Sequence, residues 1–195
     1  LHASVGWNAG DALWAGLAKH CTRRVPKMEA QHLSTTVHGF AKMGRREPAL
    51  LDAIATEAAQ RGLREFAPQA LSKTAWAYAT AGHAAPALLD AIATEAVQRS
   101  RRDFTPQGLA NTAWAYATAG HAAPALLDAI ATEAAQRGLR EFKPQNLANT
   151  AWAFAVADHP APVLFGGDAF VQRCAAERGF VPENLFQLHQ WQLWQ

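Results

Sequence analysis

Arginine residues recur at a fixed spacing in this sequence, and they are the side chains best suited to binding an anion. One row has members 38 residues apart and consists of Arg64, Arg102, Arg140 and Arg178. A second row with the same spacing consists of Arg23, Arg61, Arg99 and Arg137. A guanidinium group is permanently charged and matches the geometry of a phosphate, so either row could follow a nucleic-acid backbone. The rows therefore predict phosphate contacts along one edge of the molecule.

Acidic residues accompany both rows and give a second interpretation. Three arginines of the second row follow a glutamate by four residues, the spacing of an ion pair on one helix; these glutamates are Glu57, Glu95 and Glu133. Three arginines of the first row are followed directly by Glu65, Asp103 and Glu141. Arg23, Arg24 and Lys27 add positive charge to the first 47 residues, which hold seven basic and three acidic side chains. The sequence thus allows phosphate contact or local ion pairing at these arginines.

Polar side chains also stand at the positions that vary between otherwise similar copies of one motif. The base-facing candidates are Lys73, Asn111, Asn146 and Asn149. They occupy two positions three residues apart, which share one face of a helix. Amide and ammonium groups there could hydrogen-bond the base edges of single-stranded RNA, with one base per repeat. The other interpretation is that the asparagines join adjacent repeats by bonding backbone groups.

Three further residue types follow the same spacing. The tryptophans are Trp76, Trp114 and Trp152, the histidines are His83, His121 and His159, and the aspartates are Asp52, Asp90 and Asp128. The indoles could stack on bases, but a tryptophan buries so much apolar surface that packing between repeats is the favoured interpretation. The histidines are one repeat apart, too far to share a metal ion, so we expect them in loops. The aspartates are expected on a solvated helix face.

The sequence shows no recognisable catalytic or metal-binding motif. It has no glycine-rich phosphate loop, no nucleophile motif and no zinc-type spacing of His and Cys. We therefore expect no enzyme activity and no cofactor. Cys21 and Cys174 are far apart and are expected to be free thiols. No apolar run is long enough for a membrane span.

Prolines and glycines indicate the helices that would position these rows. Pro48 and Pro68 suit the first position of a helix, where the missing N–H costs nothing. Gly62 and Gly82 suit the left-handed residue that ends one. Together they predict one helix over 48–61 and a second over 68–81, joined as a helical hairpin.

This pair of helices repeats with a period of 38 residues, which is typical of a stacked-repeat protein. We predict an all-α fold, a right-handed α-solenoid of helical hairpins, as one domain over residues 1–195. Its units are 10–47, 48–85, 86–123, 124–161 and 162–195, with 1–9 as the tail of a preceding unit. Gly166 and Gly167 are expected to weaken or kink the first helix of the last unit. The start at Leu1, in mid-repeat and without Met, predicts a fragment of a longer chain.

The most regular copies of the repeat contain Leu-Ala-Asn-Thr-Ala-Trp-Ala, at residues 109–115 and 147–153. This motif and the period resemble the octotricopeptide repeat (OPR) family and the wider FAST-kinase-like proteins associated with a RAP domain. The resemblance covers about residues 10–195, and the segment 180–194 is similar to the stretch that leads into a RAP domain, which this sequence lacks. The copy at 71–77 departs from the pattern, with Ser72 and Lys73 for Ala and Asn.

The resemblance implies a non-catalytic RNA-binding protein of a mitochondrion or plastid. Such a protein would hold single-stranded or ribosomal RNA along one face and act in RNA processing, stabilisation, translation or ribosome assembly. Residues 48–161 hold nine basic and ten acidic side chains, and this near-neutral charge favours an alternative. The alternative is a protein-interaction scaffold, or a structural subunit of a large organellar complex such as a ribosome, in contact with other protein subunits.

Overall fold

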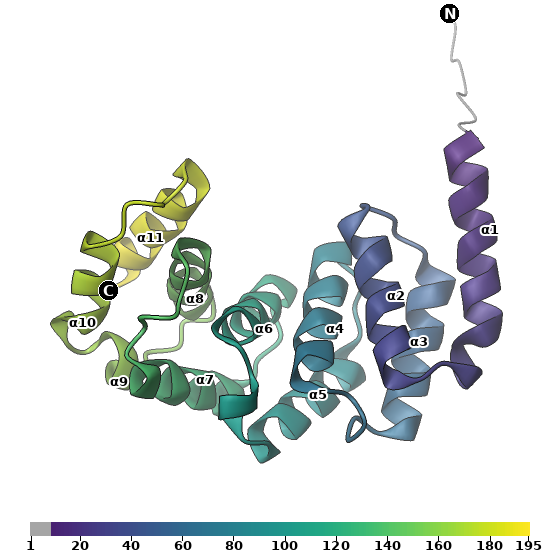
Figure 1. The fold of residues 1–195 in the computed structure, drawn as a ribbon, viewed down its shortest axis with the longest axis horizontal. Coiled ribbons are helices and arrows are strands. Elements are labelled where there is room, and N and C mark those ends of the chain that lie inside the picture. Colours follow the sequence, from purple (N-terminus) through teal and green to yellow (C-terminus); the bar gives the residue numbers. More distant parts are fainter. Residues whose placement is uncertain (1–8) are drawn as a thin grey trace, which may run out of the picture.

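The computed structural model describes residues 9–195, and all regular elements in that range are helical (Figure 1). The first helices in chain order are α1 (Ala9–Arg24), η1 (Val25–Lys27), α2 (Ala30–Lys42), α3 (Pro48–Arg61), α4 (Pro68–Ala81) and α5 (Pro86–Gln98). They are followed by η2 (Arg101–Asp103), α6 (Pro106–Ala119), α7 (Pro124–Arg137), α8 (Pro144–Val156), α9 (Pro162–Phe165), α10 (Asp168–Ala175) and α11 (Pro182–Trp194). The η elements are single turns of 3-10 helix.

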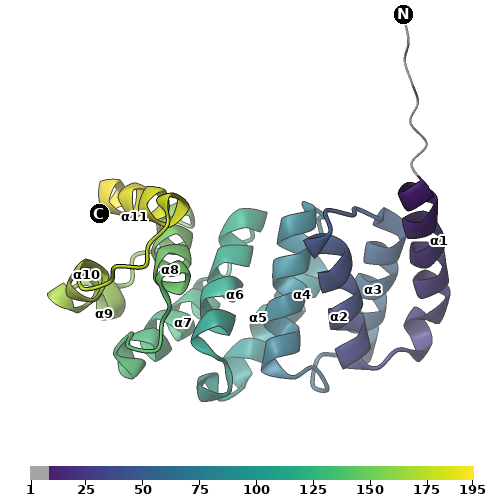
Figure 2. The same ribbon diagram turned by 45° about the horizontal axis from the view of Figure 1, so that its top comes forward.

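The helices form two curved layers, as expected for an α-solenoid (Figures 1 and 2). The inner layer contains α2, α4, α6, α8 and α11, and the outer layer contains α1, α3, α5, α7, α9 and α10. Each inner helix packs against the next over much of its length, whereas neighbouring outer helices touch over shorter stretches. The stack therefore bends toward its inner layer, and the predicted all-α solenoid of helical hairpins is confirmed.

The helix boundaries lie where the prolines and glycines predict them. Helix α3 spans Pro48–Arg61 and α4 spans Pro68–Ala81, which are the predicted bounds. Gly82 has φ +60°, a left-handed conformation that favours glycine, and it ends α4. In the last unit the outer helix breaks into α9 and α10 at Gly166 and Gly167, as expected.

Alanine lets the inner helices approach one another closely. Ala77, Ala115 and Ala153 occupy the same position in successive inner helices, and each is 0% exposed. A methyl group is the largest side chain there, so the facing backbones come close without leaving voids. The inner layer is consequently dense, and its concave surface is formed by the remaining faces of the same helices.

Two kinds of polar contact join the outer and inner helices of the central hairpins. The Tyr78 hydroxyl donates to the carbonyl of Leu51 at 2.7 Å, and Tyr116 repeats this contact with Leu89 at 2.6 Å. The second contact joins a histidine after the inner helix to an aspartate of the outer helix; the pairs are His83–Asp52, His121–Asp90 and His159–Asp128. The histidines lie in loops as predicted. The aspartates are exposed on the outer helices as predicted, and each also pairs with the histidine of its own unit.

Candidate functional site

Four positions of the repeat lie on one face of each inner helix. On α6 they are represented by Gln107, Asn111, Trp114 and Thr118, which follow one another by four, three and four residues. That spacing keeps them on one helix face. The first three of these residues line a groove, and the corresponding residues Gln145, Asn149 and Trp152 of α8 line it too.

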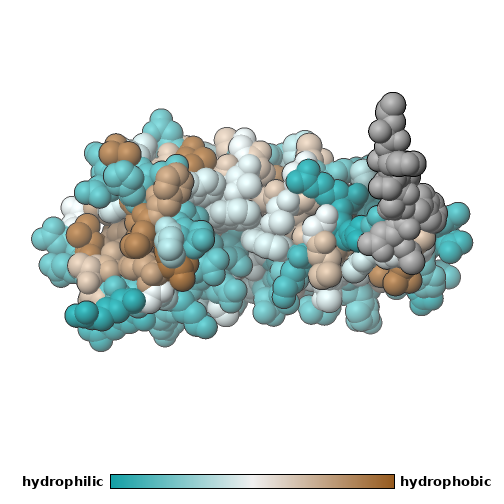
Figure 3. Space-filling view, turned by 90° about the horizontal axis from the view of Figure 1, so that it is seen from above, coloured by the Kyte–Doolittle hydropathy of each residue, from teal (hydrophilic) through white to brown (hydrophobic). Residues whose placement is uncertain are grey.

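The groove runs across the inner helices from α2 to α11 and has a volume of about 1080 Å³. Indole and amide groups dominate its lining, and among the lining residues Lys42 and Glu183 carry a full charge. Figure 3, which looks down on this side of the molecule, shows a pale to teal band across its middle. Apolar residues gather at the C-terminal end, where Leu185 and Phe186 of α11 are 53% and 63% exposed.

The aromatic rings of the groove contact one another between units. The rings of Trp114 and Trp152 have centroids 6.4 Å apart with planes inclined by 31°, and His38 lies 5.0 Å from Trp76. The indole N–H of Trp152 donates to the side-chain carbonyl of Gln190 at 2.8 Å. Each of the three tryptophans is half-buried. They therefore contribute to packing between units, as favoured from the sequence, and also present part of the ring to the groove.

The base-facing candidates divide into two groups. Lys73, Asn111 and Asn149 share the second of these positions on α4, α6 and α8, and the two asparagines line the groove. Gln187 Nε2 donates to Asn149 Oδ1 at 3.1 Å, so this asparagine also joins two repeats, although through a side chain and not through the backbone groups of the second interpretation. Asn146 has another role, because it is buried and its Oδ1 accepts from the backbone N–H of Lys143 at 3.1 Å. It caps the start of α8 and does not face the groove, contrary to the prediction.

The arginine row that includes Arg61 and Arg99 is built into the contacts between units. Arg99 donates to the backbone carbonyls of Leu63 at 3.0 Å, Arg64 at 2.6 Å and Phe66, all in the loop of the preceding unit. It also pairs with Glu95 at 2.7 Å. Arg61 makes the same kind of contact with the loop after α1, through the carbonyls of Pro26 and Met28.

The same row continues toward the C-terminus. Arg137 Nε pairs with Glu133 at 2.7 Å. Arg173 takes over the role in the broken last unit, since it donates to the carbonyls of Leu139 at 3.3 Å and Phe142 at 2.9 Å. These guanidinium groups are engaged within the protein, which favours ion pairing over phosphate contact for Arg61, Arg99 and Arg137.

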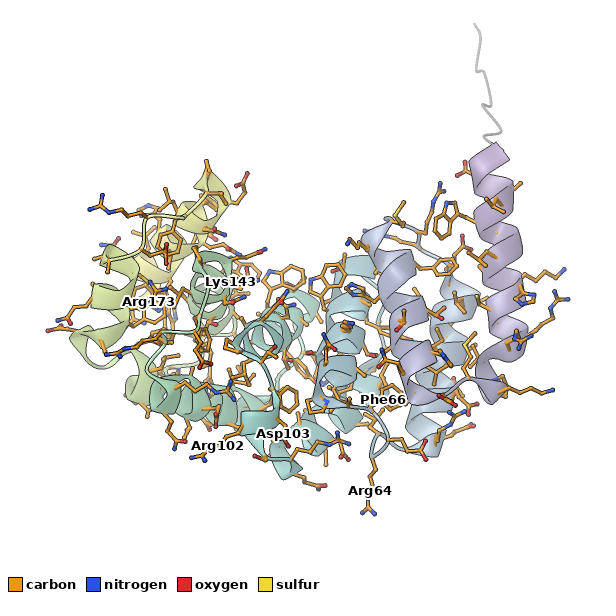
Figure 4. The ribbon with its side chains drawn as sticks, in the orientation of Figure 1. Arg64, Phe66, Arg102, Asp103, Lys143 and Arg173 are labelled. Atoms are coloured by element: carbon orange, nitrogen blue, oxygen red, sulfur yellow. The ribbon has the colours of Figure 1, made fainter. Side chains whose placement is uncertain are left out.

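The other arginine row is exposed but lies away from the groove. Arg64, Arg102 and Arg140 are exposed and occupy equivalent loops between an outer and an inner helix. Figure 4 shows Arg64 and Arg102 projecting from the outer edge of the solenoid, on the side opposite the concave opening. The exposed residues Arg23, Arg24 and Lys27 lie at the end of α1 and in η1. The structure thus does not bring these phosphate candidates together with the groove.

Sequence reasoning missed the glutamines of the groove and Thr80. Gln107 and Gln145 stand four residues before the groove asparagines, and Thr80 stands four residues after Trp76. The signal was present as a polar stripe with helical spacing on each inner helix. It could not be assigned to the concave side without knowing which layer is the inner one.

The described residues contain no cluster of metal ligands and no candidate membrane span. Within residues 9–195, no group of three His, Cys, Asp or Glu side chains could hold a metal ion. Burial raises the pKa of the Cys174 thiol to about 11, which disfavours the reactive thiolate at neutral pH. In the same range, no helix combines the length and apolar character needed to cross a lipid bilayer.

No protein-family model matches this chain, and no curated protein matches it.

Proposed function

We propose that the protein binds single-stranded RNA in the concave groove, with the bases turned toward the inner helices. The observation that carries the proposal is a repeated pair of side chains, an indole and an amide, on the same face of successive inner helices. The pairs are Asn111 with Trp114 and Asn149 with Trp152, and Lys73 takes the place of the amide beside Trp76. The octotricopeptide-like motif contains these same residues.

The chemistry of the groove suits nucleobases better than phosphates. Packed helices lie about 8–10 Å apart, so successive pairs could each receive one base of an extended strand. Stacking on an aromatic side chain contributes about 1–3 kcal/mol per base and tolerates any base. Amide groups both donate and accept hydrogen bonds, so they could bond base edges. Because the groove is nearly neutral, most of the phosphates would face solvent.

The proposal includes the organellar setting implied by the resemblance, a mitochondrion or plastid, and a non-catalytic role. Binding would then protect or position an RNA segment for processing, translation or ribosome assembly. Imaging of the complete, tagged protein in its native cells tests the location, and an exclusively cytosolic signal would contradict it.

Two asparagines of the inner layer give a matched test of RNA binding. Asn111→Ala removes an amide from the groove and should weaken binding of a short single-stranded RNA by about five- to tenfold, the scale of one hydrogen bond of about 1 kcal/mol. Asn146→Ala removes the cap of α8 and should cost about 1 kcal/mol of stability while leaving RNA affinity unchanged. Fluorescence anisotropy of labelled RNA measures the first effect and urea unfolding the second. Equal RNA affinity in both variants and the wild type would refute binding in this groove.

A protein partner is the second candidate, and the low charge of the groove favours it. Lys42 and Glu183 cancel each other among the lining residues, whereas surfaces that bind RNA through phosphates are strongly basic. Amides spaced along a groove can also bond the backbone of an extended peptide. The test is the binding of an isolated partner protein. An affinity that does not change with salt concentration, together with no competition from RNA, would support a protein-interaction role in place of RNA binding.

A further inference from the structure

The α2–α4 end of the groove differs from the rest in carrying positive charge. The groove positions that hold Asn111 and Thr118 on α6 hold Lys73 and Thr80 on α4. On α2 the position of Thr80 is occupied by Lys42. Lys42 and His38 line this stretch of the groove, and Lys73 lies near enough to His38 for its charge to act on the imidazole. We call Lys42, Lys73 and His38 the basic end of the groove.

The charges of the basic end lie close enough together to act on one another. Lys42 is one helical turn after His38 on α2, and Lys73 is one turn before Trp76, whose ring lies 5.0 Å from that of His38. Burial lowers the pKa of His38, and the ammonium groups of Lys73 and Lys42 lower it further. The guanidinium group of Arg46 lies nearby, beside Gly82 at the end of α4.

Two polar atoms at this end lack a hydrogen-bond partner. They are Nδ1 of His38 and the hydroxyl of Thr80, both buried and both belonging to residues that line the groove. A buried polar atom without a partner is unfavourable, so a ligand that bonds it gains affinity. A rotation of the Thr80 side chain or a flip of the His38 ring would break no hydrogen bond and would turn a donor toward the groove.

We propose that the basic end of the groove is a binding site for one phosphate group of the RNA strand. This inference rests on the proposed function and adds one defined contact between the RNA strand and the protein. Lys42 and Lys73 supply the charge, and Thr80 and His38 can donate hydrogen bonds to phosphate oxygens. The opposite end carries Glu183, which repels a phosphate. The strand is thus anchored over α2 and α4, and its following bases lie over the tryptophans of α6 and α8.

Inorganic phosphate is the direct probe of the site, used at constant ionic strength with chloride as the reference ion. In heteronuclear NMR spectra of the wild type, phosphate should shift the signals of the His38 ring and the Trp76 indole N–H. It should also raise the pKa of His38, because a nearby anion stabilises the imidazolium ion. The variant Lys42→Thr/Lys73→Asn gives α2 and α4 the groove residues of the following units and should lower phosphate affinity at least about tenfold.

A charge-conserving variant separates this site from general electrostatic attraction. Lys73→Asn combined with Asn111→Lys keeps the net charge and moves one ammonium group by one unit. The phosphate-induced shifts should then weaken at His38 and appear at the indole of Trp114. Shifts that are absent from His38 and Trp76 in the wild type, or unchanged in the charge-conserving variant, would overturn the inference.

Salt titration of RNA binding distinguishes failure of the site from failure of the proposed function. Removing Lys42 and Lys73 should reduce the slope of log affinity against log salt by about 0.7, the value for one phosphate on a single strand. The control Lys19→Thr/Lys27→Thr loses the same charge from exposed positions outside the groove and should keep the slope. An unchanged slope in the first variant refutes the phosphate site and leaves RNA binding intact. A normal phosphate response with no RNA binding refutes the proposed function and supports the anion site.

Discussion

The buried hydroxyls of Tyr78 and Tyr116 should stabilise the hairpins 48–85 and 86–123 by a measurable amount. Tyr116 is 1% exposed, and its hydroxyl donates to the carbonyl of Leu89 at 2.6 Å. Tyr116→Phe removes this bond and leaves the ring in place. Leu89 lies inside α5, so its carbonyl oxygen also accepts a backbone hydrogen bond within the helix, and that bond remains in the variant. We therefore expect the loss of one net hydrogen bond, about 1 kcal/mol, and not the full cost of a buried unpaired carbonyl.

The repeat provides two internal references for this experiment. Tyr78→Phe removes the equivalent bond one unit earlier and should cost the same within about 0.5 kcal/mol, with additive effects in the double variant. Phe154 occupies the same position in the next unit, is 0% exposed and has no hydroxyl. Phe154→Tyr places a hydroxyl toward the carbonyl of Leu127 and should be neutral or stabilising.

Urea unfolding followed by far-UV circular dichroism measures these differences, with linear extrapolation to water. A loss of 1 kcal/mol corresponds to a fall of about 2–4 °C in melting temperature for a chain of this length. If Tyr116→Phe unfolds at the same urea concentration as the wild type, or if Phe154→Tyr is the more damaging change, the hydroxyl does not stabilise the hairpin and the reasoning is refuted.

Other contacts give further predictions. Burial raises the pKa values of Tyr78 and Tyr116, so above pH about 10 the unfolded chain releases protons that the folded chain keeps. Stability should therefore fall by about 1.4 kcal/mol per pH unit for each tyrosine. Alkaline urea titrations should show a slope that is smaller by this amount when both residues are Phe. Arg99→Gln removes donors to three backbone carbonyls of the preceding loop and should cost about 2–3 kcal/mol, whereas the exposed Arg102→Gln should stay within about 0.5 kcal/mol in the same thermal melts. The Cys174 thiol, whose pKa burial raises to about 11, should be alkylated by iodoacetamide at a rate that still increases above pH 10, and mass spectrometry that finds a plateau below pH 9 would contradict this.

The helices were predictable because their signals are local. A proline that starts a helix and a glycine that ends it act through their own backbone conformations, so the bounds of α3 and α4 follow from the sequence. The break at Gly166 and Gly167 is local as well. A Cβ atom on Gly166 would lie 2.5 Å from the carbonyl oxygen of Pro162, so the backbone at that point accommodates glycine alone.

The candidate site was less predictable because its contacts join distant parts of the chain. Arg99 can be matched with Glu95 from their spacing, but the carbonyls it binds lie 33 to 36 residues earlier. The His83–Asp52 pair spans 31 residues and becomes visible once the hairpin is folded. Asn146 was assigned to the groove although it stands two residues after Pro144, a place where an asparagine side chain can cap the helix. The position of that proline could have corrected the assignment.

The alanine-lined contacts between inner helices have a mechanical consequence. Ala77, Ala115 and Ala153 are fully buried between helices that cannot move closer and would open voids if they moved apart. Neighbouring outer helices touch over shorter stretches, so the distance between them should change more easily than the distance between inner helices. When the solenoid flexes, we expect the spacing of the outer helices to change while the spacing of the inner helices does not. The distance between the indoles of successive units would then stay constant. A strand in the groove would therefore keep its register on the protein while the curvature changes around it.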